Sequence, residues 1–284
     1  MANVEKDPVT GTNTTGHEWD GIKELDTPLP KWWLTTFYAC IIWAIGYWVV
    51  YPSWPTLNDY AKGVFGTTNR LEHAADMAAV AQAREAWTSK FEGKEIGEVA
   101  QDSELMTYAR AGGKAIFADN CQPCHGAAGS GIKNFPVLAD DDWLWGGTLE
   151  ALQTTIKYGI RSGHDEARIS DMPALVADET ITAAEADQIA DYVMMLGGQG
   201  GSDAGQTLFE DNCSVCHAED GSGNKDLGAP RLNDGIWLYK AGKEGVLAQI
   251  TKPQHGVMPA WVGRLSDTEI KQVAIFVHSL GGGQ

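Results

Sequence analysis

The sequence predicts an all-α fold with one N-terminal transmembrane helix, a helical spacer and two tandem repeats of a small domain. Three observations predict it: an uncharged run of twenty residues, an Ala- and Glu-rich stretch free of Pro and Gly, and a Cys-x-x-Cys-His motif that occurs twice. A chain of 284 residues has room for this organisation. The expected boundaries are 1–31 for an N-terminal segment, 32–51 for the membrane helix, 52–107 for the spacer, and 108–198 and 199–284 for the two repeats.

The membrane helix is expected from Trp32 to Tyr51, where the sequence has no charged residue. Twenty residues at helical rise span about 30 Å, the thickness of a bilayer core. Trp and Tyr residues stand at both ends of the run, as interfacial anchors do. A cleaved signal peptide is disfavoured, because the run is too long and Tyr51-Pro-Ser-Trp-Pro55 follows it in place of small residues.

The spacer is expected to contain one helix, from Arg70 to Lys90. This stretch is rich in Ala, Glu and Gln and lacks Pro and Gly, and Gly93 and Gly97 then favour its end. A docking helix and a plain stalk that sets the height of the repeats are equally consistent with this composition.

The two Cys-x-x-Cys-His motifs use four of the five cysteines; the fifth, Cys40, lies in the membrane run as a small apolar residue. In this motif the two thiols form thioethers to one porphyrin and the adjacent histidine ligates its iron. A redox dithiol or half of a zinc site would not explain two copies, each followed by a suitably placed methionine. The sequence therefore predicts two covalently bound haem c groups in two class I cytochrome c domains, attached at Cys121, Cys124, Cys213 and Cys216, with His125 and His217 as proximal ligands.

The other iron ligands are expected to be methionines. Asp171-Met172-Pro-Ala and Val257-Met258-Pro-Ala follow the two motifs in order, so Met172 is paired with the first haem and Met258 with the second. A thioether suits haem iron and raises its reduction potential. His164 and His255 are the rival ligands nearby, but they do not align with each other, which disfavours bis-histidine ligation.

Each repeat is expected to orient its histidine through a loop that follows the motif. Pro136-Val-Leu and Pro230-Arg-Leu occur there, and a carbonyl in such a loop can accept the second ring N–H of the histidine. Trp143 and Trp237 come next at matching positions, where aromatic side chains line the haem pocket more often than they carry electrons.

A Gly-x-x-x-Phe pattern opens both repeats, at Gly113 and Gly205. A glycine at such a place permits the backbone of another helix to approach closely. We expect that helix to be the last one of the same repeat, 183–196 in the first and 267–280 in the second.

The chain is acidic, with a formal net charge of −17. This charge argues against nucleic acid as a partner and favours a cationic or dipolar one, although an acidic surface that only maintains solubility explains it as well.

Over nearly its whole length the chain resembles the di-haem CcoP/FixP subunit of cbb3-type cytochrome c oxidases. The most specific resemblance lies outside the haem motifs, in the segment 16–33, GHEWDGIKELDTPLPKWW, and in the exit segment 51–55, YPSWP. It implies a single-pass protein of the bacterial inner membrane, with its N-terminus in the cytoplasm and its haem domains in the periplasm.

The resemblance also implies a direction of electron flow. A donor cytochrome c, soluble or membrane-anchored, would reduce the chain, which would pass electrons to a mono-haem cytochrome c subunit. The catalytic haem-copper subunit, which reduces oxygen and pumps protons, would receive them last. No catalytic residue is expected in the chain itself. Two rivals remain open: a free-standing di-haem shuttle or dehydrogenase subunit, and a di-haem enzyme such as a peroxidase or thiosulfate dehydrogenase.

Overall fold

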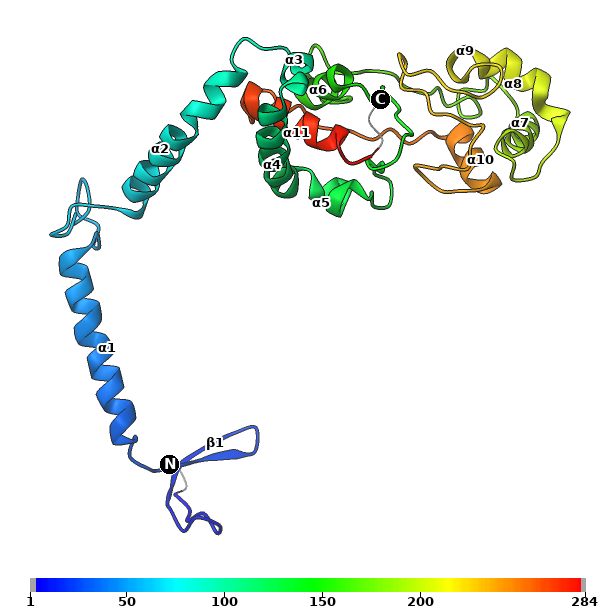
Figure 1. Cartoon of the computed structure of the whole chain (residues 1–284). Helices are drawn as coiled ribbons and strands as arrows, with labels where there is room; N and C mark the ends of the chain where they lie inside the picture. Colours follow the sequence, from blue (N-terminus) through cyan, green and yellow to red (C-terminus); the bar gives the residue numbers. More distant parts are fainter. Residues whose placement is uncertain (1–3, 282–284) are drawn as a thin grey trace. The chain divides into compact units, whose positions relative to one another are not determined.

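A computed structural model describes residues 4–281 of the chain, which divide into two compact units between Ala83 and Arg84 (Figure 1). The first unit contains β1 (Thr14–Trp19), β2 (Ile22–Leu25), α1 (Lys31–Val50) and most of α2 (Asn69–Thr88). The second unit contains the remaining helices, namely η1 (Ser89–Phe91), α3 (Ile96–Gln101), α4 (Ser103–Asn120), α5 (Gln122–His125), η2 (Ala127–Gly129), α6 (Leu149–Tyr158), α7 (Ala183–Leu196), η3 (Asp203–Gly205), α8 (Gln206–Asn212), α9 (Ser214–His217), α10 (Lys243–Thr251) and α11 (Asp267–His278).

Helix α1 confirms the predicted membrane helix, shifted by one residue at each end. Within residues 4–281 it is the one helix long and apolar enough to cross a membrane, and none of its side chains is buried in the protein. The chain after α1 folds back on the end of this helix: the amides of Val64 and Phe65 donate to the carbonyls of Val49 and Val50. Helix α2 confirms the helix predicted within the spacer.

A β-hairpin precedes the membrane helix, which the all-α prediction did not include. Strands β1 and β2 pair antiparallel, and Trp19 lies opposite Ile22 across the turn. Asp20 and Gly21 both have positive φ, 49° and 85°, as this type of two-residue turn requires. The Asp-Gly dipeptide was the signal for this hairpin in the sequence.

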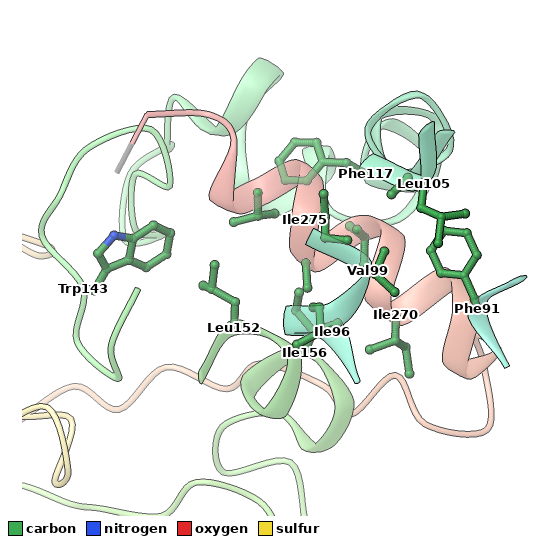
Figure 2. Packing of buried hydrophobic residues seen from close by; sticks show 14 residues of the cluster. Phe91, Ile96, Val99, Leu105, Phe117, Trp143, Leu152, Ile156, Ile270 and Ile275 are labelled. Carbon is green, nitrogen blue, oxygen red and sulfur yellow. The ribbon is translucent and has the colours of Figure 1, made fainter. Parts of the chain in front are cut away.

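The second unit holds two hydrophobic cores. We call core 1 the cluster built from residues 91–156 and 270–277, and core 2 the cluster built from residues 175–250. Figure 2 shows core 1, where Ile96 and Val99 of α3, Phe117 of α4 and Ile275 of α11 converge. The predicted boundary at residue 107/108 falls inside α4, because Asp102 caps this helix through the amides of Glu104 and Leu105.

The last helices of the two repeats are exchanged between the cores, so the predicted pairing of each with its own repeat is wrong. Helix α11, from the end of the chain, packs on α4 and α6 of the first repeat, while α7 packs on α8 and α10 of the second (Figure 1). The rings of Phe117 and Phe276 lie 5.4 Å apart, and those of Tyr192 and Phe209 lie 5.3 Å apart. Both glycines do sit at a close helix approach, as predicted, but against the helix of the other repeat.

Candidate haem-binding sites

Both Cys-x-x-Cys-His motifs form a single helical turn directly after a longer helix. In the first, the amide of His125 donates to the carbonyl of Cys121 at 2.9 Å, and in the second that of His217 donates to Cys213 at 2.9 Å. In each motif the first cysteine is half-buried against its core and the second is exposed. The two motifs thus present the same thiol and imidazole groups in the same local geometry.

A proline carbonyl orients each histidine. Nδ1 of His125 donates to the carbonyl of Pro136 at 3.2 Å, and Nδ1 of His217 donates to that of Pro230 at 3.0 Å. A carbonyl only accepts hydrogen bonds, so Nδ1 carries the proton and Nε2 keeps its lone pair. This tautomer is the one that can bind a metal through Nε2.

Burial favours the uncharged form of both histidines and of the first cysteine in each motif. Desolvation lowers the pKa of His125 and of His217, although the hydrogen bond to the proline carbonyl works in the opposite direction. Desolvation also raises the thiol pKa of Cys121 and of Cys213 to about 11. Reactive redox dithiols need a lowered thiol pKa, so these cysteines do not fit that class of site.

The structure places each methionine against the core of the other repeat. Met258 packs on core 1, together with Cys121, while Met172 packs on core 2, together with Cys213. The backbone of Met258 exchanges two hydrogen bonds with Ile160, each 3.0 Å long. The packing therefore groups Met258 with the first motif and Met172 with the second, which is the opposite of the pairing that their order in the sequence suggested.

The two rival histidines have other surroundings. Nδ1 of His164 accepts a hydrogen bond from the amide of Glu166 at 3.0 Å, and its ring lies 4.9 Å from that of Tyr158. His255 is exposed, with Nδ1 3.9 Å from a carboxylate oxygen of Asp171.

One buried polar atom tests whether the site suits a haem. Among the residues that the structure describes, Nε1 of Trp237 is the only fully buried side-chain nitrogen or oxygen without a hydrogen-bond partner. A buried indole N–H needs an acceptor, and the propionates of a haem are acceptors. Trp237 also lines a cavity of about 340 Å³ together with Pro136 and Pro230, whose carbonyls hold the two histidines. The unpaired indole N–H of Trp237, which packs against core 2, therefore fits a haem propionate as its acceptor.

The fold and these motifs define the class of protein: a membrane-anchored cytochrome c with two tandem domains. Residues 109–193 and 201–277 match the family model described as cytochrome c oxidase, cbb3-type, subunit III, and residues 11–58 match the N-terminal domain of cytochrome oxidase-cbb3, FixP. The chain belongs to the FixP/CcoP family of cbb3-type oxidase subunits, as its sequence predicted. It is thus classed with an accessory cytochrome c subunit rather than with the catalytic one.

Curated relatives extend over the whole chain. The FixP subunit of Bradyrhizobium sp. (strain ORS 278) is 48% identical over 99% of this chain and 98% of its own length. The FixP subunit of Azorhizobium caulinodans is 48% identical over 98% of this chain and 96% of its own length. The CcoP subunit of Cereibacter sphaeroides is 44% identical over 95% of each chain.

Sequence reasoning missed the residues that hold the methionine loops. They lie in the segment Gly159-Ile160-Arg161, which carries no motif. A Cβ on Gly159 would lie 2.3 Å from the carbonyl oxygen of Met258, so only glycine permits this approach. Its positive φ, 76°, was not readable from the sequence.

Proposed function

We propose that the chain carries two haem c groups and relays electrons through them as a subunit of a cbb3-type oxidase. The observation that carries this proposal is the duplicated site: a Cys-x-x-Cys-His turn, a histidine whose Nδ1 is held by a proline carbonyl, and a methionine packed on the same core. When bound, a haem exchanges one electron at its iron without a substrate of its own.

The packing of the two methionines supports an exchanged pattern of iron ligands. Cys121 and Cys124 would attach the first haem, with His125 and Met258 on its iron. The second haem would be attached by Cys213 and Cys216, with His217 and Met172 on its iron. Pro136 and Pro230 orient the histidines and maintain their basicity. A methionine for each iron disfavours the di-haem enzyme as an alternative, because such enzymes need an open or unusually ligated iron.

Membership of the family supports a path for the electrons. Electrons would enter from a donor cytochrome c and leave to the mono-haem subunit and then to the haem-copper subunit. Haem attachment takes place outside the cytoplasm in this class of protein, so α1 would cross the inner membrane with the N-terminus inside and the second unit in the periplasm. Both cores lie in one compact unit, which supports transfer between the two haems within the chain.

Histidine substitutions test the ligand set. Met172→His and Met258→His should each lower the midpoint potential of one haem, because imidazole stabilises ferric iron better than a thioether does. Repeating both in a chain with Cys213→Ser and Cys216→Ser, which retains only the first haem, tests the exchange. There Met258→His should shift the remaining haem and Met172→His should not. Unchanged midpoints in all variants would reject methionine ligation, and the reverse assignment would reject the exchange.

Purification from the native membrane tests the partners. A haem-copper subunit and a mono-haem cytochrome c subunit should co-purify in equal amounts with the chain. Recovery of the chain alone, or with a periplasmic dehydrogenase, would favour the shuttle or dehydrogenase alternative.

A further inference from the structure

One arginine connects the two methionine loops. Nε of Arg161 donates to the carbonyl of Gly256 at 2.7 Å, two residues before Met258. Nη1 of the same side chain donates to the carbonyl of Ser170 at 2.6 Å, two residues before Met172. A single guanidinium thus holds the chain ahead of both proposed iron ligands, although those ligands belong to different cores.

The surroundings of Arg161 favour this contact over solvent. Its side chain is only 24% exposed, and its Nη1 lies 3.8 Å from a carboxylate oxygen of Asp171. Gly256, whose carbonyl accepts from Arg161, also donates its amide to the hydroxyl of Tyr239 at 3.1 Å. The loop that carries Met258 is therefore held between a residue of each repeat.

The backbone of Arg161 is in a conformation that arginine adopts rarely. Its φ is +51°, in the left-handed region that favours glycine and asparagine. Residues persist there when their surroundings determine the conformation, and such positions are common at functional sites. Ile160 and Arg168 bond to the backbone on either side: Ile160 to Met258, and Arg168 to Gly159 and Arg161. This arrangement directs one arginine side chain towards both loops.

The chemistry of the side chain matches the task. A guanidinium has donors that point in several fixed directions in one plane, so it bonds two carbonyls at once and keeps the distance between them constant. An ammonium group offers a single donor centre at the end of a flexible stem. Hydrogen bonds from a charged donor are also stronger than those between neutral groups.

We propose that Arg161 is a positioning residue shared by both methionine loops, so that one side chain maintains methionine ligation at both haems. The inference rests on the proposed function, since it requires Met172 and Met258 to be iron ligands. Arg161 acts through the two loops and touches neither iron. Its loss would loosen both thioethers together, which no residue confined to one core would do.

The test compares variants of the full-length chain, assembled with its haems in the membrane. Arg161→Gln removes the charge and the planar fork, whereas Arg161→Lys keeps the charge alone. Arg264→Gln, at an exposed position six residues beyond Met258, is the control with the same charge change. Each variant is measured by redox titration of both haems and by the methionine-to-iron charge-transfer band of the ferric protein, at equal haem content.

For Arg161→Gln and Arg161→Lys we expect partial loss of the charge-transfer band and a downward shift of both midpoints, because a weakened thioether ligand stabilises ferrous iron less against ferric iron. Arg264→Gln should leave both unchanged. A shift at one haem only would overturn the proposal. Wild-type behaviour of Arg161→Lys would overturn it as well, because a positive charge alone at this position would then be sufficient. If Arg161→Gln fails to incorporate haem, Arg161→Lys decides by the same criteria.

The methionine variants separate this inference from the function beneath it. If Met172→His and Met258→His each shift one haem while the Arg161 variants shift none, the relay function stands and the shared positioning role fails. If the methionine variants shift nothing, ligation by methionine itself is rejected.

Discussion

Core 1 and core 2 each adjoin one Cys-x-x-Cys-His motif, but they differ in which stretches of the sequence supply their residues. Core 2 is continuous, because all its buried residues lie between Leu175 and Ile250. Core 1 is split: its residues come from 91–156 and again from 270–277, on both sides of core 2. In three dimensions core 2 is therefore an insertion into core 1, although the sequence reads as two repeats in a row.

The two cores also differ in what lies before the motif. Core 1 has the long helix α4 and, ahead of it, η1 and α3, whose Phe91, Ile96 and Val99 are almost completely buried. Lys271 of α11 is buried as well, and its ammonium donates to the carbonyl of Lys94 at 2.6 Å. Core 2 has only η3 and the seven-residue α8 at the corresponding place. Core 1 is thus joined to the spacer, whereas core 2 is bounded on both sides by segments that return to core 1.

The largest effect is expected from cutting the chain in two different ways. A fragment of residues 162–256, exported behind a cleavable signal, contains all of core 2 and should fold around one haem. Fragments 108–198 and 199–284 should not fold cooperatively, because each separates α7 or α11 from its partners. Burying one large apolar side chain stabilises by about 1.5–3 kcal/mol, and losing several exceeds a typical total of about 5–15 kcal/mol.

The measurements for the fragments are haem content and thermal unfolding by circular dichroism, with residues 84–284 as the intact reference. Cooperative unfolding of fragment 108–198 with one bound haem would show that each repeat closes its own core, and the exchange of helices would then be wrong.

Glycine substitutions probe the two close helix approaches one at a time. A Cβ on Gly113 would lie 2.1 Å from the carbonyl oxygen of Gln272 in α11, and one on Gly205 would lie 2.1 Å from that of Gln188 in α7. Since backbone must move in both cases, Gly113→Ala and Gly205→Ala should each lower the free energy of unfolding by about 1–3 kcal/mol. The expected difference is in location: the first should disturb the haem of core 1, the second that of core 2.

Gly112→Ala is the matched control for this pair. Its Cβ would meet only the side-chain amide of Gln272, at 2.8 Å, and a flexible side chain can move aside. Denaturant unfolding, followed at the haem absorption and by circular dichroism, gives the comparison. Equal stability of Gly112→Ala and Gly113→Ala would mean that α11 does not pack tightly on α4.

Much of this architecture could be predicted from the sequence, because local chemistry determines it. The uncharged run predicted α1, the absence of Pro and Gly predicted α2, and the spacing of each proline after its motif anticipated a carbonyl near Nδ1 of His125 and His217. Each of these features depends on residues close together in the chain.

The exchange of helices could not be predicted in the same way. The Gly-x-x-x-Phe pattern at Gly113 indicates that some helix approaches, but α7 and α11 both present an aromatic side chain and both suit it. Whether α7 or α11 packs against Gly113 depends on the path of the backbone between Tyr158 and Met258. This path depends on backbone contacts at Gly159 and Ile160, which have no recognisable pattern in the sequence. The packing of Met258 on core 1 and of Met172 on core 2 could not be predicted for the same reason.

The smallest effect is expected where the two repeats meet, at Asp142. Burial raises the pKa of this carboxyl, and the nearby carboxylates of Asp234 and Asp140 raise it further, against a smaller opposing effect of Arg231. A carboxyl with a raised pKa binds more protons in the folded state than in the unfolded state. The contribution of Asp142 to the free energy of unfolding therefore decreases as pH rises from the ordinary aspartate pKa, about 3.9, through the raised value, and the full decrease persists at neutral pH.

Asp142→Asn removes this pH-dependent decrease in stability. The stability advantage of this variant over the parent chain, measured by denaturant unfolding, should therefore grow as pH rises and then level off. Asp141→Asn, at an exposed neighbour with the same charge change, removes only the smallest contribution to the raised pKa of Asp142, so its advantage over the parent chain should grow much less with pH. If both variants behave alike, the carboxylates at this junction are solvated, and the contact between the two cores is looser than the burial of Asp142 implies.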